Sequence, residues 1–399
     1  MHTKTTLNQP LPRGPVLDWS SFKIQNVLPL PSIESVGHTA LTSSGRAAIY
    51  QALLQLKLPA GSHILVPSYH SPSMIAPVIL AHLNIVFFGL DIDGLPNLGT
   101  IDSATERKCS AMLVTHYFGL TRSLAKIRKW CDERAITLIE DCAHCYFGEA
   151  GERQVGAWGD YSTASLSKFF PMSEGGLLVS AHHPITTLSL KSSSGMAQLK
   201  GIIDILEQAI KHKRLKGLSS GLSVLFWLKN TNPRLAFDIE KMHDFTAASM
   251  LKDCDMGRIN QTPLWATMLL KVILPRGRII ANRHRNFLLY GQFFKNVRGA
   301  MPLFPIATES IAPYAFPLWV DDPERIYQAL RNKNLPVCRW DRVWPETPHL
   351  AGDVGPSWSH HVLQLLCHQD LSVLDIERTA LAIRGLLPAP RNQKVTLST

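Results

Sequence analysis

Short apolar segments alternate with segments of helical spacing through the first half of the sequence. The apolar segments cover residues 63–68, 84–92, 110–119 and 136–144, and the helical segments cover residues 47–58, 74–83 and 123–135. This alternation predicts an α/β fold with a mostly parallel sheet flanked by helices. Ligands of such sheets bind at the carboxyl ends of the strands. The polar residues that end each apolar segment are therefore candidates for a functional site.

The pattern changes after this alternating region. Further elements are expected as an amphipathic helix at 201–218, an apolar segment at 222–230, a helix at 264–294 broken at Pro275, a strand near Tyr314, and helices at 323–334 and 371–387. The chain should therefore have three parts. They are an N-terminal arm at 1–35, a large α/β domain at 36–260 with a longer helical insert at about 183–256, and a small α+β domain at 261–399.

The formal net charge of +10 is scattered along the chain, except for a basic cluster at 210–217. A basic amphipathic segment can lie on a membrane or bind a partner, but a surface helix packed on its own domain or on a dimer mate is favoured. No nucleic-acid-binding motif is present, so we expect no nucleic-acid partner. No apolar run reaches the roughly 18 residues of a membrane span, and the start lacks a signal-peptide core, which predicts a cytoplasmic protein.

Seven cysteines in a chain of 399 residues are typical of reduced thiols. Cys142 and Cys145 form a CxxC pair, which raises the alternatives of a redox pair or a zinc site. Zinc would need a second pair of ligands, and none stands at a matching spacing. We therefore expect thiols that line a strand end, and no metal.

Asp141 ends the apolar segment "ITLIED" and so places a carboxylate at the functional edge of the sheet. Three roles are open for it, which are a general base, a metal ligand, or a partner for a protonated ring nitrogen. His116 also closes an apolar segment, but an isolated histidine of this kind is more often a hydrogen-bonded core residue than a catalyst.

The stretch "LTSSGRAAIYQAL" predicts a helix N-terminus at residues 41–53 with free backbone N–H groups. Such a terminus binds anions, Gly45 permits a close backbone approach, and Arg46 adds a charged fork. An ordinary serine N-cap is the alternative, and it would be favoured if the motif stood alone.

Lys168 lies in "SLSKFFPMSEGG" at the end of another apolar segment. Burial beside Phe169 and Phe170 would lower the pKa of its amine and make the amine nucleophilic. Taken alone, a surface lysine is the better interpretation. Together with Asp141 and the helix N-terminus, however, it meets the needs of pyridoxal 5′-phosphate (PLP), which are an amine, an anion for the ring nitrogen and a phosphate anchor.

These motifs resemble the DegT/DnrJ/EryC1/StrS aminotransferase family of fold-type I PLP-dependent enzymes. The resemblance runs from about Thr39 to Leu387 and is strongest at 41–181, in "SSGRAAIYQALL", "VTHYFG", "LIEDCAHCYFG" and "SLSKFFPMSEGGLLVS". It implies a large domain built on a seven-stranded type of sheet, a small C-terminal α+β domain, PLP as the cofactor, and a homodimer.

The resemblance also implies roles for individual residues. Lys168 matches the lysine that bonds the cofactor, and Asp141 matches the partner of its ring nitrogen. His144 stands where the family usually has a glutamine near the 3-hydroxyl. The remaining contacts that it implies are the phosphate turn at Gly45, Arg46 and Ala47, the phosphate-contacting Ser165, and Asn260 reaching the other subunit.

Three positions depart from the family pattern or concern the substrate. The ring-stacking residue is aromatic in many members, but the matching position is Ser71, so His70 or Tyr69 would substitute, and His70 is preferred. Lys168 lies closer to Ser165 than is usual. Arg339 matches a substrate-facing position.

The implied activity is transfer of an amino group from glutamate or glutamine to a keto-sugar carried on a nucleotide, for a surface glycan or a secondary metabolite. A related dehydratase branch replaces the lysine with histidine, so Lys168 argues against that branch. Two alternatives stay open. One is a PLP enzyme of this fold with a non-sugar acceptor, and the other is a non-catalytic regulator or membrane-associated scaffold.

Overall fold

The computed structural model describes residues 10–186, 188–218 and 246–388. The predicted apolar segment at 222–230 and the first nine residues of the predicted arm lie outside these ranges. The boundaries proposed for the three parts stay predictions. The two main sheets nevertheless fall on either side of the proposed boundary at residue 260, since the first uses residues 38–180 and the second uses residues 300–366.

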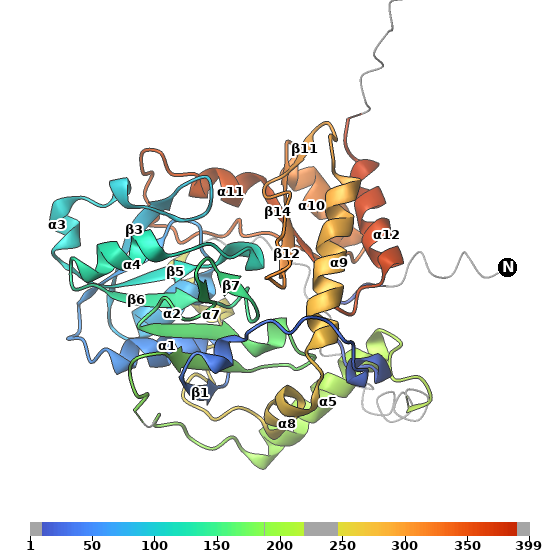
Figure 1. Cartoon of the computed structure of the whole chain (residues 1–399), viewed down its shortest axis with the longest axis horizontal. Helices are drawn as coiled ribbons and strands as arrows, with labels where there is room; N and C mark the ends of the chain where they lie inside the picture. Colours follow the sequence, from blue (N-terminus) through green and yellow to red (C-terminus); the bar gives the residue numbers. More distant parts are fainter. Residues whose placement is uncertain (1–9, 187, 219–245, 389–399) are drawn as a thin grey trace, which may run out of the picture.

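An eight-stranded sheet forms the centre of the larger part of the molecule (Figure 1). In spatial order its strands are β1 (His38–Thr42), β10 (Gly176–Ser180), β9 (Tyr161–Ser165), β6 (Thr137–Asp141), β5 (Cys109–Thr115), β2 (His63–Pro67), β3 (Asn84–Leu90) and β4 (Pro96–Asn97). The run from β9 to β3 is parallel, whereas β1, β10 and β4 pair antiparallel with their neighbours. The prediction of a mostly parallel sheet flanked by helices is therefore confirmed.

Alternate side chains of the central strands enter two separate apolar clusters. Ile64 and Val66 of β2 pack with the helices α1 (Gly45–Gln55), α2 (Pro72–Leu80) and α7 (Ala247–Asp253), whereas Leu65 faces the opposite side. That opposite side is covered by α4 (Ala125–Asp132) through its buried residue Ile127. Both faces are thus apolar, which explains why the central strands are near-continuous hydrophobic runs in the sequence.

A second, four-stranded antiparallel sheet carries the C-terminal part of the chain. Its order is β11 (Ala300–Pro302), β12 (Ala315–Val320), β14 (Val362–Leu366) and β13 (Val337–Cys338). The helices of this part are α9 (Gly277–Phe293), α10 (Pro323–Asn332), α11 (Gly355–His361) and α12 (Val373–Arg384). A short helix α3 (Ser103–Glu106) and a two-stranded sheet of β7 (Glu149–Ala150) and β8 (Arg153–Gln154) are also present.

Two helices near the predicted insert lie side by side (Figure 1). They are α5 (Gly195–Lys211) and α8 (Trp265–Ile273). The chain breaks between α8 and α9 around Pro275, as predicted from the proline, because a proline removes one hydrogen bond of the helix and clashes with the preceding turn. Among the helices of the described ranges, none has the length and the hydrophobicity needed to cross a bilayer.

The described part of the N-terminal arm runs across the C-terminal sheet region. The Leu11 N–H donates to the Asn334 carbonyl at 3.1 Å, and the Val16 N–H donates to Asp370 Oδ2 at 3.0 Å. Short 3₁₀ turns follow at Trp19–Phe22 and Ile33–Ser35. The arm is therefore anchored to residues that lie more than 300 positions later in the sequence.

Candidate active site

A cavity of about 560 Å³ opens at the carboxyl ends of the parallel strands. Thr115 at the end of β5, Asp141 at the end of β6 and Ser165 at the end of β9 all line it. The cavity is completed by the start of α1, by α5 and by Trp340 of the C-terminal part. It occupies the place at which an open α/β sheet binds its ligands.

Lys168 ends the 3₁₀ turn that follows β9, and its amine reaches the cavity wall. Behind it, Phe169 and Phe170 are fully buried. Burial lowers the pKa of the Lys168 amine, while attraction by Asp141 opposes that shift. The Nζ atom lies 5.2 Å from the ring centroid of Tyr314. The turn therefore presents a partly desolvated amine, which has the character of a nucleophile or base.

Asp141 is 3% exposed and lies at the base of the same cavity. Burial raises the pKa of its carboxyl group, and the charge of Lys168 together with the Ala143 N–H counteracts the rise. The Ala143 N–H donates to Oδ1 at 2.9 Å. A cation brought next to this carboxylate would replace some of the solvation that burial removes.

The N-terminus of α1 forms the opposite wall. Ser44 is the N-cap, and its hydroxyl accepts the Ala47 N–H at 3.2 Å, so that N–H is already used within the helix. A Cβ atom on Gly45 would lie 3.1 Å from Cβ of Ser165, so the glycine permits the close approach of these two segments. Arg46 lines the cavity, but its Nε donates to the Asp255 carbonyl at 2.9 Å and its Nη2 lies 3.4 Å from Oδ2 of the same residue.

His144 lines the cavity and stacks on Tyr314, with ring centroids 4.2 Å apart and ring planes 12° apart. Its Nδ1 accepts the Phe118 N–H at 3.2 Å. Burial lowers the pKa of His144 well below its usual range, and the charge of Lys168 adds to that effect. The ring is therefore neutral, and its proton resides on Nε2, which is left as a hydrogen-bond donor.

Two of the predicted aromatic contacts do not reach the cavity. His70 is fully buried, its Nδ1 donates to the Pro67 carbonyl at 2.9 Å, and its Nε2 accepts the Trp344 N–H at 2.8 Å. Tyr69 is also fully buried, and its hydroxyl accepts the Gln364 amide at 3.3 Å. His70 is thus held away from the ring position for which it was preferred, whereas Ser71 does line the cavity.

Arg339 and Asn260 also lie outside this cavity. Arg339 is held by Glu324 at 2.7 Å and by Asp341 at 3.6 Å, so its guanidinium is already neutralised by carboxylates. The Asn260 side chain accepts a hydrogen bond from Gln51 at 3.0 Å within the same chain. The structure does not direct Arg339 toward the cavity, and the predicted contact of Asn260 with another subunit stays a prediction.

Several lining residues escaped the sequence analysis. They are Thr115, Ser167, Arg258 and Trp340. Thr115 follows the same strand-end rule that identified Asp141, so that rule would have found it. Arg258 lies in the segment "GRINQ", whose resemblance to the family implied a contact with the other subunit rather than with this cavity. Trp340 approaches from a distant segment and left no comparable signal. Tyr314, at the edge of the site, was noted only as the start of a strand.

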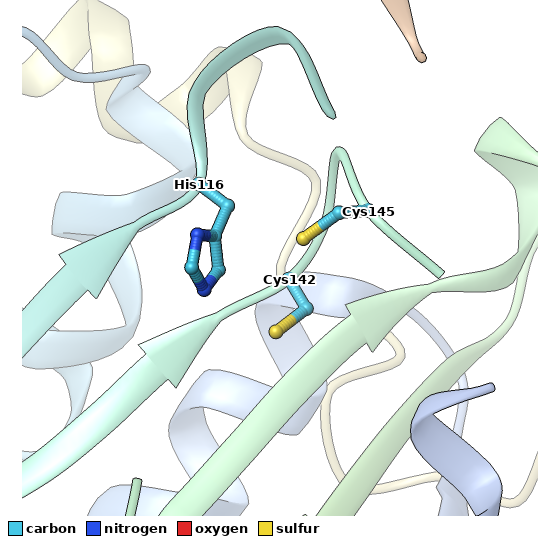
Figure 2. Close-up of side chains that lie close together, drawn as sticks. All are labelled: His116, Cys142 and Cys145. Atoms are coloured by element: carbon cyan, nitrogen blue, oxygen red, sulfur yellow. The ribbon is translucent and has the colours of Figure 1, made fainter. Parts of the chain in front are cut away.

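The CxxC pair forms part of a buried group with His116 (Figure 2). The donor atoms of His116, Cys142 and Cys145 all lie within 4.8 Å of one another, and this is a candidate metal set among the described residues. However, His116 Nε2 is bonded to Glu140 Oε1 at 2.8 Å, and burial raises the pKa of both thiols. Thiols held in the protonated form are poor metal ligands. The expectation of no metal here stays a prediction.

The residues of the cavity fit PLP. The hydroxyl of Thr115 is buried at the wall and has no hydrogen-bond partner among the described residues. The hydroxyls of Ser165 and Ser167 lie 3.5 Å apart and line the cavity together with Gly45 at the N-terminus of α1, and helix N-termini bind anions. The amine of Lys168 and the carboxylate of Asp141 line the same space.

Comparison with known proteins gives the same family as the motifs. Residues 33–200 match the model of the DegT/DnrJ/EryC1/StrS aminotransferase family. GDP-perosamine synthase of Vibrio cholerae is 27% identical over 148 residues, which cover 36% of this chain. The L-glutamine:2-deoxy-scyllo-inosose aminotransferase of Micromonospora echinospora is 28% identical over 173 residues, which cover 42% of this chain. Each alignment spans 40% of the relative's own length.

The fold extends beyond these alignments. The aminotransferase TlmJ from Streptoalloteichus hindustanus superposes with a TM-score of 0.61 at 18% identity, covering 87% of this chain and 85% of that one. At this identity the similarity shows the fold alone, over most of the chain.

Proposed function

We propose that the chain is a PLP-dependent aminotransferase of the DegT/DnrJ/EryC1/StrS family, whose model residues 33–200 match. The observation that carries the proposal is that Lys168 and Asp141 line one cavity at the strand ends, where each shifts the pKa of the other. The amino donor is glutamate or glutamine, and the acceptor is a keto-sugar or a related carbonyl compound.

Bound PLP supplies an electron sink that stabilises negative charge at the α-carbon of an amino acid. Lys168 would bind the cofactor through Nζ. Once the amine of the donor has displaced Nζ from the cofactor, the freed Lys168 amine would hold the proton that leaves the α-carbon of the donor. Asp141 keeps the ring nitrogen protonated, because a buried carboxylate is stabilised by an adjacent cation. Lys168 thus serves proton transfer, whereas Asp141 stabilises the positive charge on the ring nitrogen.

Other residues of the cavity orient the cofactor. The hydroxyls of Ser165 and Ser167 and the N-terminus of α1 at Gly45 bind the phosphate. His144 donates its Nε2 proton to the oxygen on the ring, since Nδ1 is occupied by the Phe118 N–H. Trp340 covers the cavity from the C-terminal part and helps to exclude water.

The ion pairs of the basic residues in the cavity favour, as a second candidate function, an acceptor that carries no nucleotide. Three of the basic side chains that line the cavity are already paired with carboxylates, as Arg46 with Asp255, Arg258 with Glu174, and Lys200 with Asp204. A nucleotide diphosphate would have to compete with these carboxylates, whereas an uncharged cyclic ketone would not. The relative from Micromonospora is named for such a compound, a deoxy-scyllo-inosose. Paired assays with nucleotide-linked and free keto-sugars distinguish the two acceptors.

We further propose a homodimer that uses an exposed apolar face of α8. Trp265, Leu269 and Val272 lie on one side of this helix and are 65%, 58% and 79% exposed. Such a stripe is costly in water and is typical of an interface. Leu264, directly before α8, lines the cavity, so a second copy seated on this face would lie beside the site. Trp265→Glu should convert the dimer to monomers in analytical ultracentrifugation.

The basic end of α5 gives little support to the scaffold alternative. Arg214 donates to the Asp370 carbonyl at 2.8 Å and lies 3.9 Å from Asp18, so it serves the packing of the arm. We assign the enzyme to the cytoplasm, where the seven cysteines stay reduced. Every one of them is a free thiol in the structure.

The test is cofactor attachment. The purified protein should be yellow, and borohydride should attach the cofactor covalently to the peptide that contains Lys168, as read by mass spectrometry. Lys168→Ala should abolish both the attachment and transamination, whereas Lys108→Ala, at an exposed lysine, should change neither. A Lys168→Ala protein with full transamination, or a wild-type protein that takes up no PLP, would refute the proposal.

A further inference from the structure

A second, smaller cavity of about 60 Å³ adjoins Lys168 on the side of the N-terminal arm. It is lined by Arg13, Gly14, Pro15, Ser167, Lys168, Tyr314, Leu366 and His368. Lys168 and Ser167 line both cavities, so the amine stands between them. The proposed function places the cofactor in the larger cavity and assigns no ligand group to the smaller one.

The arm holds Arg13 at the edge of this space. The Leu11 N–H donates to the Asn334 carbonyl, and the Pro12 carbonyl accepts a hydrogen bond from His368 Nε2 at 2.9 Å. Arg13 itself donates from Nη2 to the Val337 carbonyl at 3.0 Å. That carbonyl is neutral, and within the described ranges no carboxylate forms an ion pair with Arg13. The guanidinium is therefore anchored, while most of its donors are left for a ligand.

The surroundings of this cavity are positive. Arg13 and Lys168 supply two cations to its lining, which includes no aspartate or glutamate. Arg283 lies behind it, fully buried, and donates to the neutral oxygens of Gln369, Pro313 and Lys168. Burial lowers the pKa of His368 to about 4, so that ring is neutral and adds no charge. The three cations of Arg13, Lys168 and Arg283 face two buried carboxylates, Asp141 and Asp370, and the net positive charge that is left attracts anions.

We propose that Arg13 and this cavity form the subsite for the α-carboxylate of the amino donor. This inference rests on the proposed function. The donor's amine must reach the cofactor at Lys168, and its carboxylate is joined to the same carbon, so the carboxylate must lie within a few ångströms of that lysine. A space of this size holds a few water molecules and so accommodates a carboxylate. The planar guanidinium of Arg13 can donate two parallel hydrogen bonds to the two oxygens of a carboxylate.

The proposed subsite also gives the N-terminal arm a function. Residues 10–18 cover the C-terminal sheet region and bring Arg13 beside Lys168, although the two residues are far apart in the sequence. Because Arg13 is itself exposed, the carboxylate would enter from solvent without any rearrangement of the buried core.

The experiment compares Arg13→Met with Arg107→Met, which removes an exposed arginine elsewhere on the surface. Succinate binding to the full chain is measured by calorimetry, with and without PLP. The KM is measured for L-glutamate and for its α-amide, which lacks the α-carboxylate. Arg13→Met should weaken succinate binding and raise the KM for L-glutamate by roughly 10- to 100-fold, the scale expected for losing a charge-assisted pair. The KM for the α-amide should stay unchanged, and Arg107→Met should resemble the wild type.

The controls separate this inference from the function on which it rests. Arg13→Lys keeps the charge but loses the fork, so its succinate affinity should fall between those of the wild type and Arg13→Met. The proposed subsite would be refuted if Arg13→Met bound succinate as tightly as the wild type does. It would also be refuted if the variant raised the KM for glutamate and the KM for its α-amide equally. Failure of the wild type to take up PLP would refute the aminotransferase. Calorimetry on the cofactor-free chain would still decide whether Arg13 binds a carboxylate.

Discussion

The carboxylate of Glu140, beside the site, accepts several buried hydrogen bonds, so replacing it should lower the stability of the protein. Glu140 is fully buried directly before Asp141. Its Oε1 accepts hydrogen bonds from the Gly156 N–H at 2.7 Å and from His116 at 2.8 Å, and its Oε2 accepts the Trp158 and Gly159 N–H groups at 3.0 and 3.1 Å. Longer contacts from Cys142 to Oε1 at 3.5 Å and from Ser162 to Oε2 at 3.4 Å add to these, so each oxygen satisfies at least two buried donors.

The Glu140→Gln change replaces one of these oxygens with an NH₂ group. If the amide oxygen keeps the Oε1 position, the NH₂ group faces the Trp158 and Gly159 N–H groups, and in the opposite orientation it faces the Gly156 N–H and His116. At least two buried donors lose their acceptor in either case. At about 1–3 kcal/mol for each unsatisfied donor, the free energy of unfolding should fall by roughly 4 kcal/mol.

The loss should depend on pH. Burial raises the pKa of Glu140, but the contact with His116 and the backbone N–H donors outweigh it and hold the pKa below its usual range. The stabilisation by the carboxylate is therefore complete above the unfolded value of about 4.3 and disappears as pH falls through the folded pKa. The variant has no such group, so the difference between the two proteins should shrink below about pH 4.3.

The assay is urea unfolding followed by tryptophan fluorescence at pH 7 and at several values below pH 4.3. Glu149→Gln serves as the control, because that residue is exposed, and it should change stability by less than about 0.5 kcal/mol. The reasoning fails if Glu140→Gln lies within about 1 kcal/mol of the wild type at pH 7, since two orphaned donors would cost more. It also fails if the difference is constant down to acid pH.

Three further changes test the site itself. Asp141→Asn removes the charge that supports the Lys168 cation, so the pKa of Lys168 should fall further, and its labelling by an amine-reactive reagent in the cofactor-free protein should begin at lower pH. Gly45→Ala places a Cβ 3.1 Å from that of Ser165, which should weaken PLP binding in equilibrium dialysis while the melting temperature changes little. Arg283→Met leaves three buried carbonyl-type acceptors unpaired, so thermal denaturation should show a stability loss of roughly 3 kcal/mol or more. Unaltered labelling, binding or melting in the respective variant would contradict each expectation.

The sheet and the placing of Lys168 and Asp141 at one cavity could be predicted, because both follow from local rules. Buried parallel strands require apolar runs, and the ends of such strands meet at one edge, which brings the two residues together without knowledge of the rest of the fold. The antiparallel pairing of β10 and β1 left no such signal, since a short apolar run reads the same in either direction.

The side-chain directions depended on distant partners. His70 was expected at the cofactor ring, but the Trp344 N–H, 274 positions later, binds its ring nitrogen and fixes it elsewhere. Arg339 was expected to face the substrate, but Glu324 on α10 pairs with it. Trp340 enters the cavity from the C-terminal part. Contacts of this range arise only when the two sheets pack, so a linear pattern does not encode them.

The anchoring of the N-terminal arm has a consequence for biosynthesis. Val16 bonds to Asp370, 354 positions later, so the arm leaves the ribosome early while its docking partner is made near the end of translation. Domains fold as they emerge, and contacts of such long range form late. The wall that Arg13 contributes beside Lys168 is therefore completed last. A bulky fusion at the N-terminus would act on this final step of maturation rather than on the folding of the eight-stranded sheet.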